Sequence, residues 1–350
     1  MDLISTYANG VSELTNFSQS VERAPLMVDV IVNPHAGFFK RRATVWKHVQ
    51  ELELKLTELR RRYPRRKVEI HTVHFTERPG HARTITEQIL QEEEKTQSGL
   101  EHLLIGCGGD GTSNEICTAL VQADRSLLDR LKLLRLPLGT GNDMADAATF
   151  TEAYDLILGS QQAVATGALV IRTASGAEHY AFNIASVGLD AYIADLTNRF
   201  KRVIPGDAYK SLVDLGSLFY DQRVKLQPMD LVLHSPAGES KLEAFLPSMV
   251  IVGVSGQRTY GGHIPALPGP QNVCVVGHMS VLKKVRSKKV LYEGRHKELA
   301  EVSFHDAESV EIRYPSRIPM QVDGEVSWLG RQDFPVRMRV LDPKIKVLRN

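Results

Sequence analysis

Two different spacings of apolar residues divide the chain. From about residue 27 to residue 150, short apolar runs alternate with stretches in which apolar residues recur every three or four positions. The run at 27–32 predicts a buried strand, and the segment after it predicts a helix with one apolar face formed by Val45, Val49, Leu52, Leu56 and Leu59. Further strands are predicted at 67–75, at 102–106 and from residue 132. Strands that alternate with helices predict an α/β fold with a doubly wound parallel sheet.

After about residue 150 the pattern changes to short alternating runs divided by Gly, Pro and Ser, with one helix expected at 207–221. This pattern predicts a second domain dominated by an antiparallel β-sandwich. A chain of 350 residues is also long for one core, which favours two domains. We therefore expect an N-terminal extension (1–26), an α/β domain (27–150), a β-sandwich domain (151–330) and a C-terminal segment that returns to the first domain (331–350).

Composition limits the classes of function. A formal charge of +2 is too balanced to indicate nucleic-acid binding. The first 25 residues lack the features of a signal peptide, and no run approaches the roughly 20 apolar residues of a membrane span. Membrane contact is therefore expected to be peripheral and the location cytoplasmic. The cysteines form no CxxC pair, which fits a reducing compartment: Cys107, Cys117 and Cys274.

The stretch IGCGGDGTSNE (105–115) lies where a predicted strand gives way to a predicted helix. Gly108, Gly109 and Gly111 would let the backbone approach a ligand closely, and amides at the helix start favour phosphate oxygens. Thr112 adds a hydroxyl. Asp110 suggests a Mg²⁺ ion or an ordering role, since a bare carboxylate repels phosphate. The alternative is a tight turn with Asp110 as the helix N-cap.

Two further loops with glycine and polar residues follow predicted strands. They are NPHAG (33–37) and PLGTGND (137–143). The carboxyl ends of parallel strands lie at one edge of a sheet, where α/β folds bind ligands. We therefore expect these loops and the GGDGT loop to converge.

These loops resemble the catalytic domain of the diacylglycerol kinase and sphingosine kinase superfamily, most of all its bacterial-type soluble lipid kinases. GGDGT alone is weak evidence, because NAD kinases and phosphofructokinases carry similar loops. The resemblance also includes TERPGHA (76–82), FNIASVGLDAYIA (182–194), GQRTYGGHIPA (256–266) and QVDGE (321–325), so that it covers about residues 27–345.

The resemblance implies an ATP-dependent, Mg²⁺-using kinase with a nucleotide-binding domain, a β-sandwich lipid domain and an active site in the cleft between them. Asp110 falls on the essential loop aspartate, so the catalytic Mg²⁺ is expected near Asp110 and the phosphates. Asp323 and Glu325 fall on the segment credited with the general base, although Asp-Gly is also an ordinary hairpin turn signal. The implied nucleotide-binding residues are Asn33, Gly37, Thr76, Gly108, Gly109, Asp110, Gly111, Thr112, Asn114, Gly139, Thr140, Asn142 and Asp143.

One segment departs from the family pattern. Bacterial members with a structural Mg²⁺ have acidic residues after the GGxxxxP block, whereas here Pro270 and Cys274 lie roughly at those positions. This departure argues against a structural Mg²⁺ site. Ala36 also replaces a serine that is common in the family.

The favoured function is transfer of the ATP γ-phosphoryl group to a hydroxyl of diacylglycerol or a related lipid alcohol. The alternatives are a sphingoid-base or NAD kinase of the same superfamily, and a nucleotide- or lipid-binding regulator without catalysis. A lipid partner and a peripheral membrane surface are expected, nucleic acid is not, and a homodimer is compatible with the sequence.

The basic run at 60–67 is typical of a solvated helix end, whereas the one at 283–289 is interspersed with apolar residues and is a candidate for membrane docking. Trp46 is expected in the core.

Overall fold

The computed structural model describes residues 2–18, 26–62, 68–96, 98–139, 142–159, 163–201, 214, 216–260 and 264–349. The chain forms two compact units. Unit 1 comprises Met1–Thr166 and Pro343–Asn350, and unit 2 comprises Gly167–Asp342. Among the described residues, no helix has both the length and the apolar character needed to cross a bilayer.

Unit 1 is built on a parallel sheet with the strand order β2-β1-β3-β4-β18. The last part of β18 (Val336–Leu348) lies parallel to β4, with Lys346 opposite Lys132. The inner strands are almost completely buried, which explains their continuous apolar runs. The predicted parallel sheet is therefore confirmed, and its other strands are β1 (Leu26–Val32), β2 (Val68–Phe75), β3 (Glu101–Cys107) and β4 (Leu131–Arg135).

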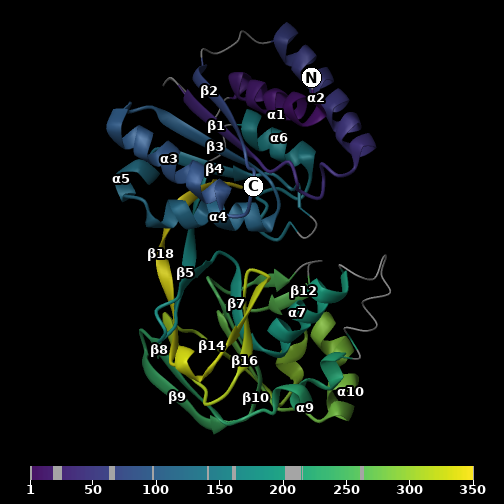
Figure 1. Ribbon diagram of the computed structural model, residues 1–350, viewed down its shortest axis with the longest axis vertical. Coiled ribbons are helices and arrows are strands. Elements are labelled where there is room, and N and C mark those ends of the chain that lie inside the picture. The colour runs from purple at the N-terminus through teal and green to yellow at the C-terminus, as the bar shows by residue number, and fades with distance from the viewer. Residues whose placement is uncertain are drawn as a thin grey trace. The chain divides into compact units, whose positions relative to one another are not determined.

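Helices cover both faces of this sheet (Figure 1). One face packs against α1 (Leu3–Leu14), α2 (Arg42–Arg62) and α6 (Phe150–Leu158) in a single apolar core. The other face carries α3 (His81–Thr96), α4 (Asp110–Gln122) and α5 (Arg125–Leu128).

Two features of the N-terminal half differ from the sequence analysis. Helix α1 was not expected, although its apolar residues Leu3, Tyr7, Val11 and Leu14 recur at helical spacing and pack on α2. The expectation for Trp46 was wrong, because its side chain is 52% exposed. The apolar face of α2 is complete without it, since Val45, Leu52 and Leu56 are the residues that α2 buries.

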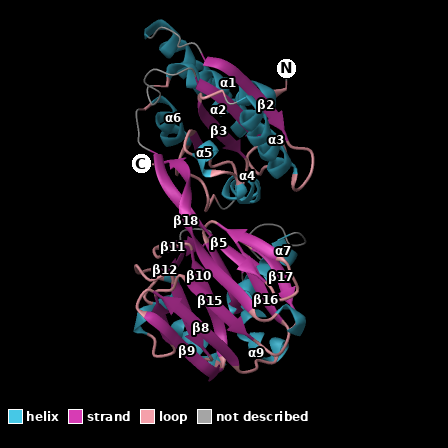
Figure 2. Cartoon of the chain, turned by 90° about the vertical axis from the view of Figure 1, so that its left-hand side faces the viewer, coloured by secondary structure: helices cyan, strands magenta, loops and turns pink. Residues whose placement is uncertain are grey.

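Unit 2 is a β-sandwich, as predicted, and Figure 2 shows its strands. Aliphatic side chains from two sheets meet in one core. The first sheet contains β18 with β15 (Ser309–Arg313), β8 (Met229–Ser235), β9 (Gly238–Phe245), β5 (Ala163–Arg172) and β6 (Glu178–Ala181). The second has six strands, β14 (Val302–His305), β13 (Val273–Gly277), β10 (Pro247–Gly253), β7 (Ile184–Gly188), β16 (Ile318–Val322) and β17 (Glu325–Leu329). A hairpin is formed by β11 (Arg258–Tyr260) and β12 (Ile264–Leu267).

The helices of unit 2 include α7 (Leu189–Lys201), α9 (Tyr220–Val224) and α10 (Val281–Tyr292). Most of the helix expected at 207–221 lies outside the described residues. Helices α7 and α10 were not predicted, so the expectation of one helix in this half was wrong. Helix α7 packs on the six-stranded sheet through β7 and β16.

Candidate functional site

The three loops singled out in the sequence converge within unit 1. Asn33 follows β1, and its side-chain Nδ2 donates a hydrogen bond to Thr112 Oγ1 at 2.9 Å. The Asn33 backbone amide donates to the carbonyl of Cys107 at 2.9 Å, and the Phe38 amide donates to the carbonyl of Leu138 at 3.2 Å. The first loop is therefore hydrogen-bonded to both of the others.

The second and third loops touch where both contain glycine. A Cβ atom on Gly139 would lie 2.8 Å from Gly109 Cα, and one on Gly109 would lie 3.1 Å from Gly139 Cα. A Cβ on Gly108 would meet Thr112 Cβ at 2.5 Å. These three glycines are therefore needed for the close packing of the loops. Gly111 differs, because a Cβ built there meets nothing within 4 Å apart from its chain neighbours and the backbone of its own helix.

The start of α4 lacks a side-chain cap. Its N-cap residue is Gly109, and Asp110 is the first helical residue. The interpretation of Asp110 as N-cap was therefore wrong. The Asp110 Oδ1 atom instead accepts a hydrogen bond from the Met144 amide at 3.0 Å, which ties α4 to the third loop. Because the first amides of a helix have no intrahelical acceptor, the α4 N-terminus favours an anion.

The third loop is held by Asn142, which adopts a positive φ of 58°. The Asn142 Oδ1 atom accepts a hydrogen bond from the Gly139 amide at 2.6 Å. Asp143 is exposed, and Thr140 lies outside the described residues. Two remaining predicted residues occupy the neighbouring segments: Gly37 in the first loop, and Asn114 on α4, where its Oδ1 accepts from Thr118 Oγ1 at 3.3 Å.

A buried ion pair anchors the third loop to the sheet. Asp146 accepts hydrogen bonds from the Arg135 backbone amide at 2.8 Å, from its Nε at 3.0 Å and from its Nη2 at 2.6 Å. Arg349 Nε donates to the same carboxylate at 3.2 Å. Burial alone would lower the pKa of Arg135, but Asp146 outweighs it and the pKa is raised. The motif-based analysis missed this pair, because neither residue belongs to a glycine loop.

The TERPGHA turn is closed by a residue from α4. Glu115 accepts hydrogen bonds from the Gly80 amide at 2.7 Å and the Ala82 amide at 3.0 Å, at the start of α3. The buried Thr76 begins this turn, and its amide donates to the Val32 carbonyl at 2.9 Å. The start of α3 is therefore occupied by a carboxylate. Of these two helices, α4 is the one whose first amides have no side-chain cap.

In unit 2, Asp323 lies at the tip of the β16–β17 hairpin with a φ of 47°. Its carboxylate accepts hydrogen bonds from the amides of Phe182 at 2.7 Å, Asn183 at 3.0 Å and Ile184 at 3.1 Å. Both carboxylate oxygens thus fix the hairpin to the β6–β7 junction. Glu325 is the first residue of β17, and its side chain is exposed.

A partly buried carboxylate that the sequence analysis missed belongs to Asp190, the second residue of α7. Asp190 accepts hydrogen bonds from Ser186 Oγ at 2.5 Å, Tyr260 Oη at 2.9 Å and its neighbour's amide, that of Ala191, at 2.8 Å. Burial raises the pKa of Asp190 despite these bonds. Asn183 Nδ2 also donates to the Thr259 carbonyl at 3.0 Å. The blocks 182–194, 256–266 and 321–325 are therefore joined to one another within unit 2.

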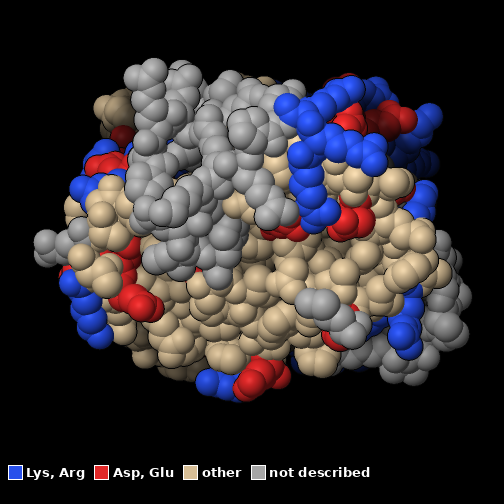
Figure 3. Space-filling view, turned by 90° about the horizontal axis from the view of Figure 1, so that it is seen from above, with Lys and Arg blue, Asp and Glu red and all other residues tan. Residues whose placement is uncertain are grey.

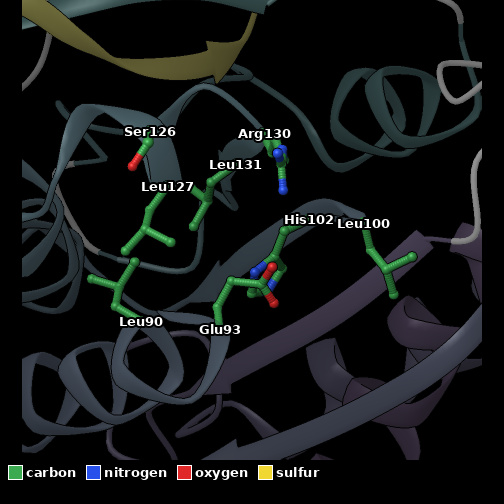
Figure 4. A pocket seen from close by; sticks show the side chains of 8 residues that line it. All are labelled: Leu90, Glu93, Leu100, His102, Ser126, Leu127, Arg130 and Leu131. Atoms are coloured by element: carbon green, nitrogen blue, oxygen red, sulfur yellow. The ribbon is translucent and has the colours of Figure 1, made fainter. Parts of the chain in front are cut away.

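A small cavity lies away from the glycine loops, at the amino ends of β3 and β4 (Figure 4). Its volume is about 20 Å³, room for a single water molecule. His102 lines it and donates through Nε2 to the buried Asp29 at 2.8 Å, while His74 Nε2 donates to the other carboxylate oxygen at 2.7 Å. Burial would raise the pKa of Asp29, but these hydrogen bonds outweigh it and lower the pKa. The cavity is too small for a nucleotide.

Two arginines of the first basic run, Arg60 and Arg62, are paired with acidic groups. Arg60 donates to Glu13 at 2.6 Å and to Glu53 at 2.8 Å, and Arg62 lies 2.9 Å from Glu58. Residues 63–67 lie outside the described residues. Figure 3 likewise shows basic and acidic side chains next to one another around a broad area of other residues.

The segment that contains these loops is similar to a known catalytic domain. Residues 27–169 match the model of the diacylglycerol kinase catalytic domain. This segment of the chain is similar to diacylglycerol kinase catalytic domains. Both the phosphate-favouring start of α4 and the two loops that frame it lie within the matched segment.

Two relatives of known name are similar in sequence to this chain. YtlR of Bacillus subtilis is 27% identical over 320 residues, which is 85% of this chain and 92% of that protein. YegS of Shigella flexneri is 36% identical over 119 residues, 33% of this chain and 38% of that protein. Both proteins bear the name lipid kinase. The prediction of an enzyme of the lipid kinase class is thereby confirmed.

The fold agrees with solved structures as well. The crystal structure of a diacylglycerol kinase from Bacillus anthracis str. Sterne superposes with a TM-score of 0.55 at 18% identity, covering 93% of this chain and 97% of the other. A second structure from the same strain gives a TM-score of 0.57, also at 18% identity, with the same coverage. The two-domain fold of a parallel α/β sheet and a β-sandwich is therefore confirmed.

Proposed function

We propose that the protein transfers the γ-phosphoryl group of ATP to a hydroxyl of diacylglycerol or a related lipid alcohol. The observation that carries the proposal is the uncapped start of α4, framed by loops whose glycines pack backbone against backbone. Such a helix start offers free amides and the positive end of the helix dipole to an anion. The lipid kinase names of the relatives support a lipid as the acceptor.

In this proposal the nucleotide phosphates lie over Gly111 and Thr112, where the helix amides are uncapped and no side chain fills the space beside Gly111. Asn33 orients the Thr112 hydroxyl through its 2.9 Å hydrogen bond. Asp110 offers an oxygen ligand of the type that Mg²⁺ prefers, so this donor set fits a nucleotide-bound Mg²⁺. The ion would offset the negative charge of the phosphates.

The acceptor hydroxyl is a weak nucleophile, so the reaction needs a base within hydrogen-bond reach. We assign this role to one of the two carboxylates of the VDGE turn. Asp323 is held rigidly by three backbone amides, whereas Glu325 is exposed on the adjoining strand. Comparison of Asp323→Asn with Glu325→Gln identifies which of them takes the proton.

The experiment that tests the proposal uses γ-³²P-labelled ATP and a panel of lipid alcohols in mixed micelles. We expect label in phosphatidic acid, formed from diacylglycerol, or in the phosphate ester of one related lipid alcohol. Label in a sphingoid base or in NAD would instead support the corresponding kinase. ATP binding without acceptor-dependent release of ADP would support a non-catalytic regulator and contradict the proposal.

A further inference from the structure

Helix α10 has its apolar and polar faces reversed. Lys284 and Ser287 are buried, whereas Leu282 is 59% exposed and Val285 is 52% exposed. Leu282, Val285, Arg286 and Lys289 have the spacing of one helical face, and all four are exposed. A helix that only covers a sandwich would place its leucine and valine inward. The outward face therefore needs an explanation other than the stability of the isolated protein.

The orientation of α10 is fixed by its buried side. Lys284 Nζ donates to both carboxylate oxygens of Asp221 at 2.7 Å and lies 5.8 Å from the ring centroid of Tyr220, which links α10 to α9. Lys283 is hydrogen-bonded to Glu301. Rotation that buried Leu282 would leave the Lys284–Asp221 pair unmade, and a buried charge without a partner is strongly unfavourable. The exposed apolar face is thus enforced by the fold.

Other exposed apolar residues lie on segments bonded to α10 or leading into it. Phe219 directly precedes α9 and is half-exposed. Leu246 is also exposed, and its carbonyl accepts from the amide of His278, just before α10 begins. Figure 1 shows α9 and α10 close together in unit 2. Exposed leucine, valine and phenylalanine side chains that gather in one region mark an interaction surface.

The charges on α10 indicate which kind of partner binds its exposed face. Asp221 and Glu301 are paired with Lys284 and Lys283, and Glu293 lies 3.7 Å from Lys289. Arg286 and Lys289 outnumber that one carboxylate, so the outward face keeps a net positive charge. A second copy is disfavoured, because a two-fold contact would bring the same cations together. A bilayer with anionic lipids suits both components: the aliphatic side chains enter the interface and the cations meet lipid phosphates.

We propose that the α10 docking face, formed by Val281, Leu282, Val285, Arg286 and Lys289, binds an anionic membrane surface. The inference rests on the proposed function in one respect, namely that the acceptor is a lipid dissolved in such a membrane. It goes beyond that function because it names the surface and the lipid charge that bring the enzyme to its substrate.

The test is sedimentation of the whole 350-residue chain with vesicles that contain no lipid-alcohol acceptor, in buffer without nucleotide. Vesicles of phosphatidylcholine mixed with phosphatidylglycerol are compared with vesicles of phosphatidylcholine alone. We expect binding to the mixed vesicles and an affinity lower by about tenfold or more in Leu282→Glu and in Val285→Glu. Arg286→Gln, which removes one cation, should weaken binding by roughly fivefold. Leu54→Glu is the matched control, since Leu54 is an exposed leucine on α2.

Three outcomes would overturn the docking proposal. They are equal binding of Leu282→Glu and wild type, equal loss of binding in Leu54→Glu, and a wild-type dimer that only the α10 variants abolish in the absence of vesicle binding. Phosphoryl transfer to a short-chain acceptor in detergent is measured separately and should be unchanged in Leu282→Glu. If wild type lacks that transfer but still binds vesicles through α10, the proposed function fails while the docking face stands.

Discussion

Replacement of Asp110 by alanine is expected to reduce phosphoryl transfer by roughly a thousandfold or more, because a charge that aligns the phosphates and their cation acts mainly in the transition state. The fold is expected to be unchanged, since Asp110 is partly exposed and the substitution removes a single hydrogen bond, the one that the Met144 amide donates to it. The measurement is the initial rate of labelled lipid formation, with circular dichroism as the check on folding.

Asp110→Asn separates the two roles that the carboxylate could have. Asparagine keeps an oxygen that can accept from the Met144 amide at the position where Asp110 does so at 3.0 Å. It lacks the negative charge. If Asp110 acts on the phosphates through a cation, both variants lose activity. Wild-type turnover in Asp110→Asn would show that the residue only orders the loop.

Replacement of Asp146 by alanine is expected to lower the free energy of unfolding by about 3–5 kcal/mol, because it leaves the buried Arg135 guanidinium without its partner. Asp146 and Arg135 are both almost completely buried, and three Arg135 nitrogens donate to that carboxylate. Urea unfolding followed by circular dichroism measures the change.

The matched control for that substitution is Asp155→Ala. Asp155 forms an ion pair with Lys55 at 2.9 Å, but its side chain is largely exposed. A surface pair contributes about 1 kcal/mol or less, so this variant should unfold almost as wild type does. Equal effects of the two substitutions would contradict the structural role given to the Arg135–Asp146 pair.

The framework of unit 1 could be predicted because its strands are buried on both sides. Continuous apolar runs such as 27–32 read directly as strands of a parallel sheet. Helix α10 could not be predicted in this way, because Lys284 is buried and Leu282 is exposed, the reverse of the usual apolar spacing. The expectation for Trp46 rested on its place in an amphipathic helix and was wrong, because the residues that α2 buries are Val45, Leu52 and Leu56.

Part of the candidate site could also be predicted from a local sequence pattern. Glycines in loops after strands mark close backbone approach, and Gly109 and Gly139 do approach one another. The supporting carboxylates could not be found in this way. Glu115 accepts from amides 35 and 33 residues away, and Asp146 accepts from a guanidinium 11 residues away. No motif or helical spacing indicates such partners. Asp190 belongs to the same class, since its partner Tyr260 is 70 residues away.

The central claim is that the start of α4 holds nucleotide phosphates, and Gly111→Ala tests it most directly. The space beside Gly111 is open, so alanine fits there and should leave the unfolding temperature unchanged or slightly higher. In the proposed complex the added methyl group occupies space needed by phosphate. We predict that calorimetric titration with Mg²⁺-ATP gives an affinity for Gly111→Ala roughly tenfold or more below that of wild type. Equal affinities in the two proteins would contradict the account.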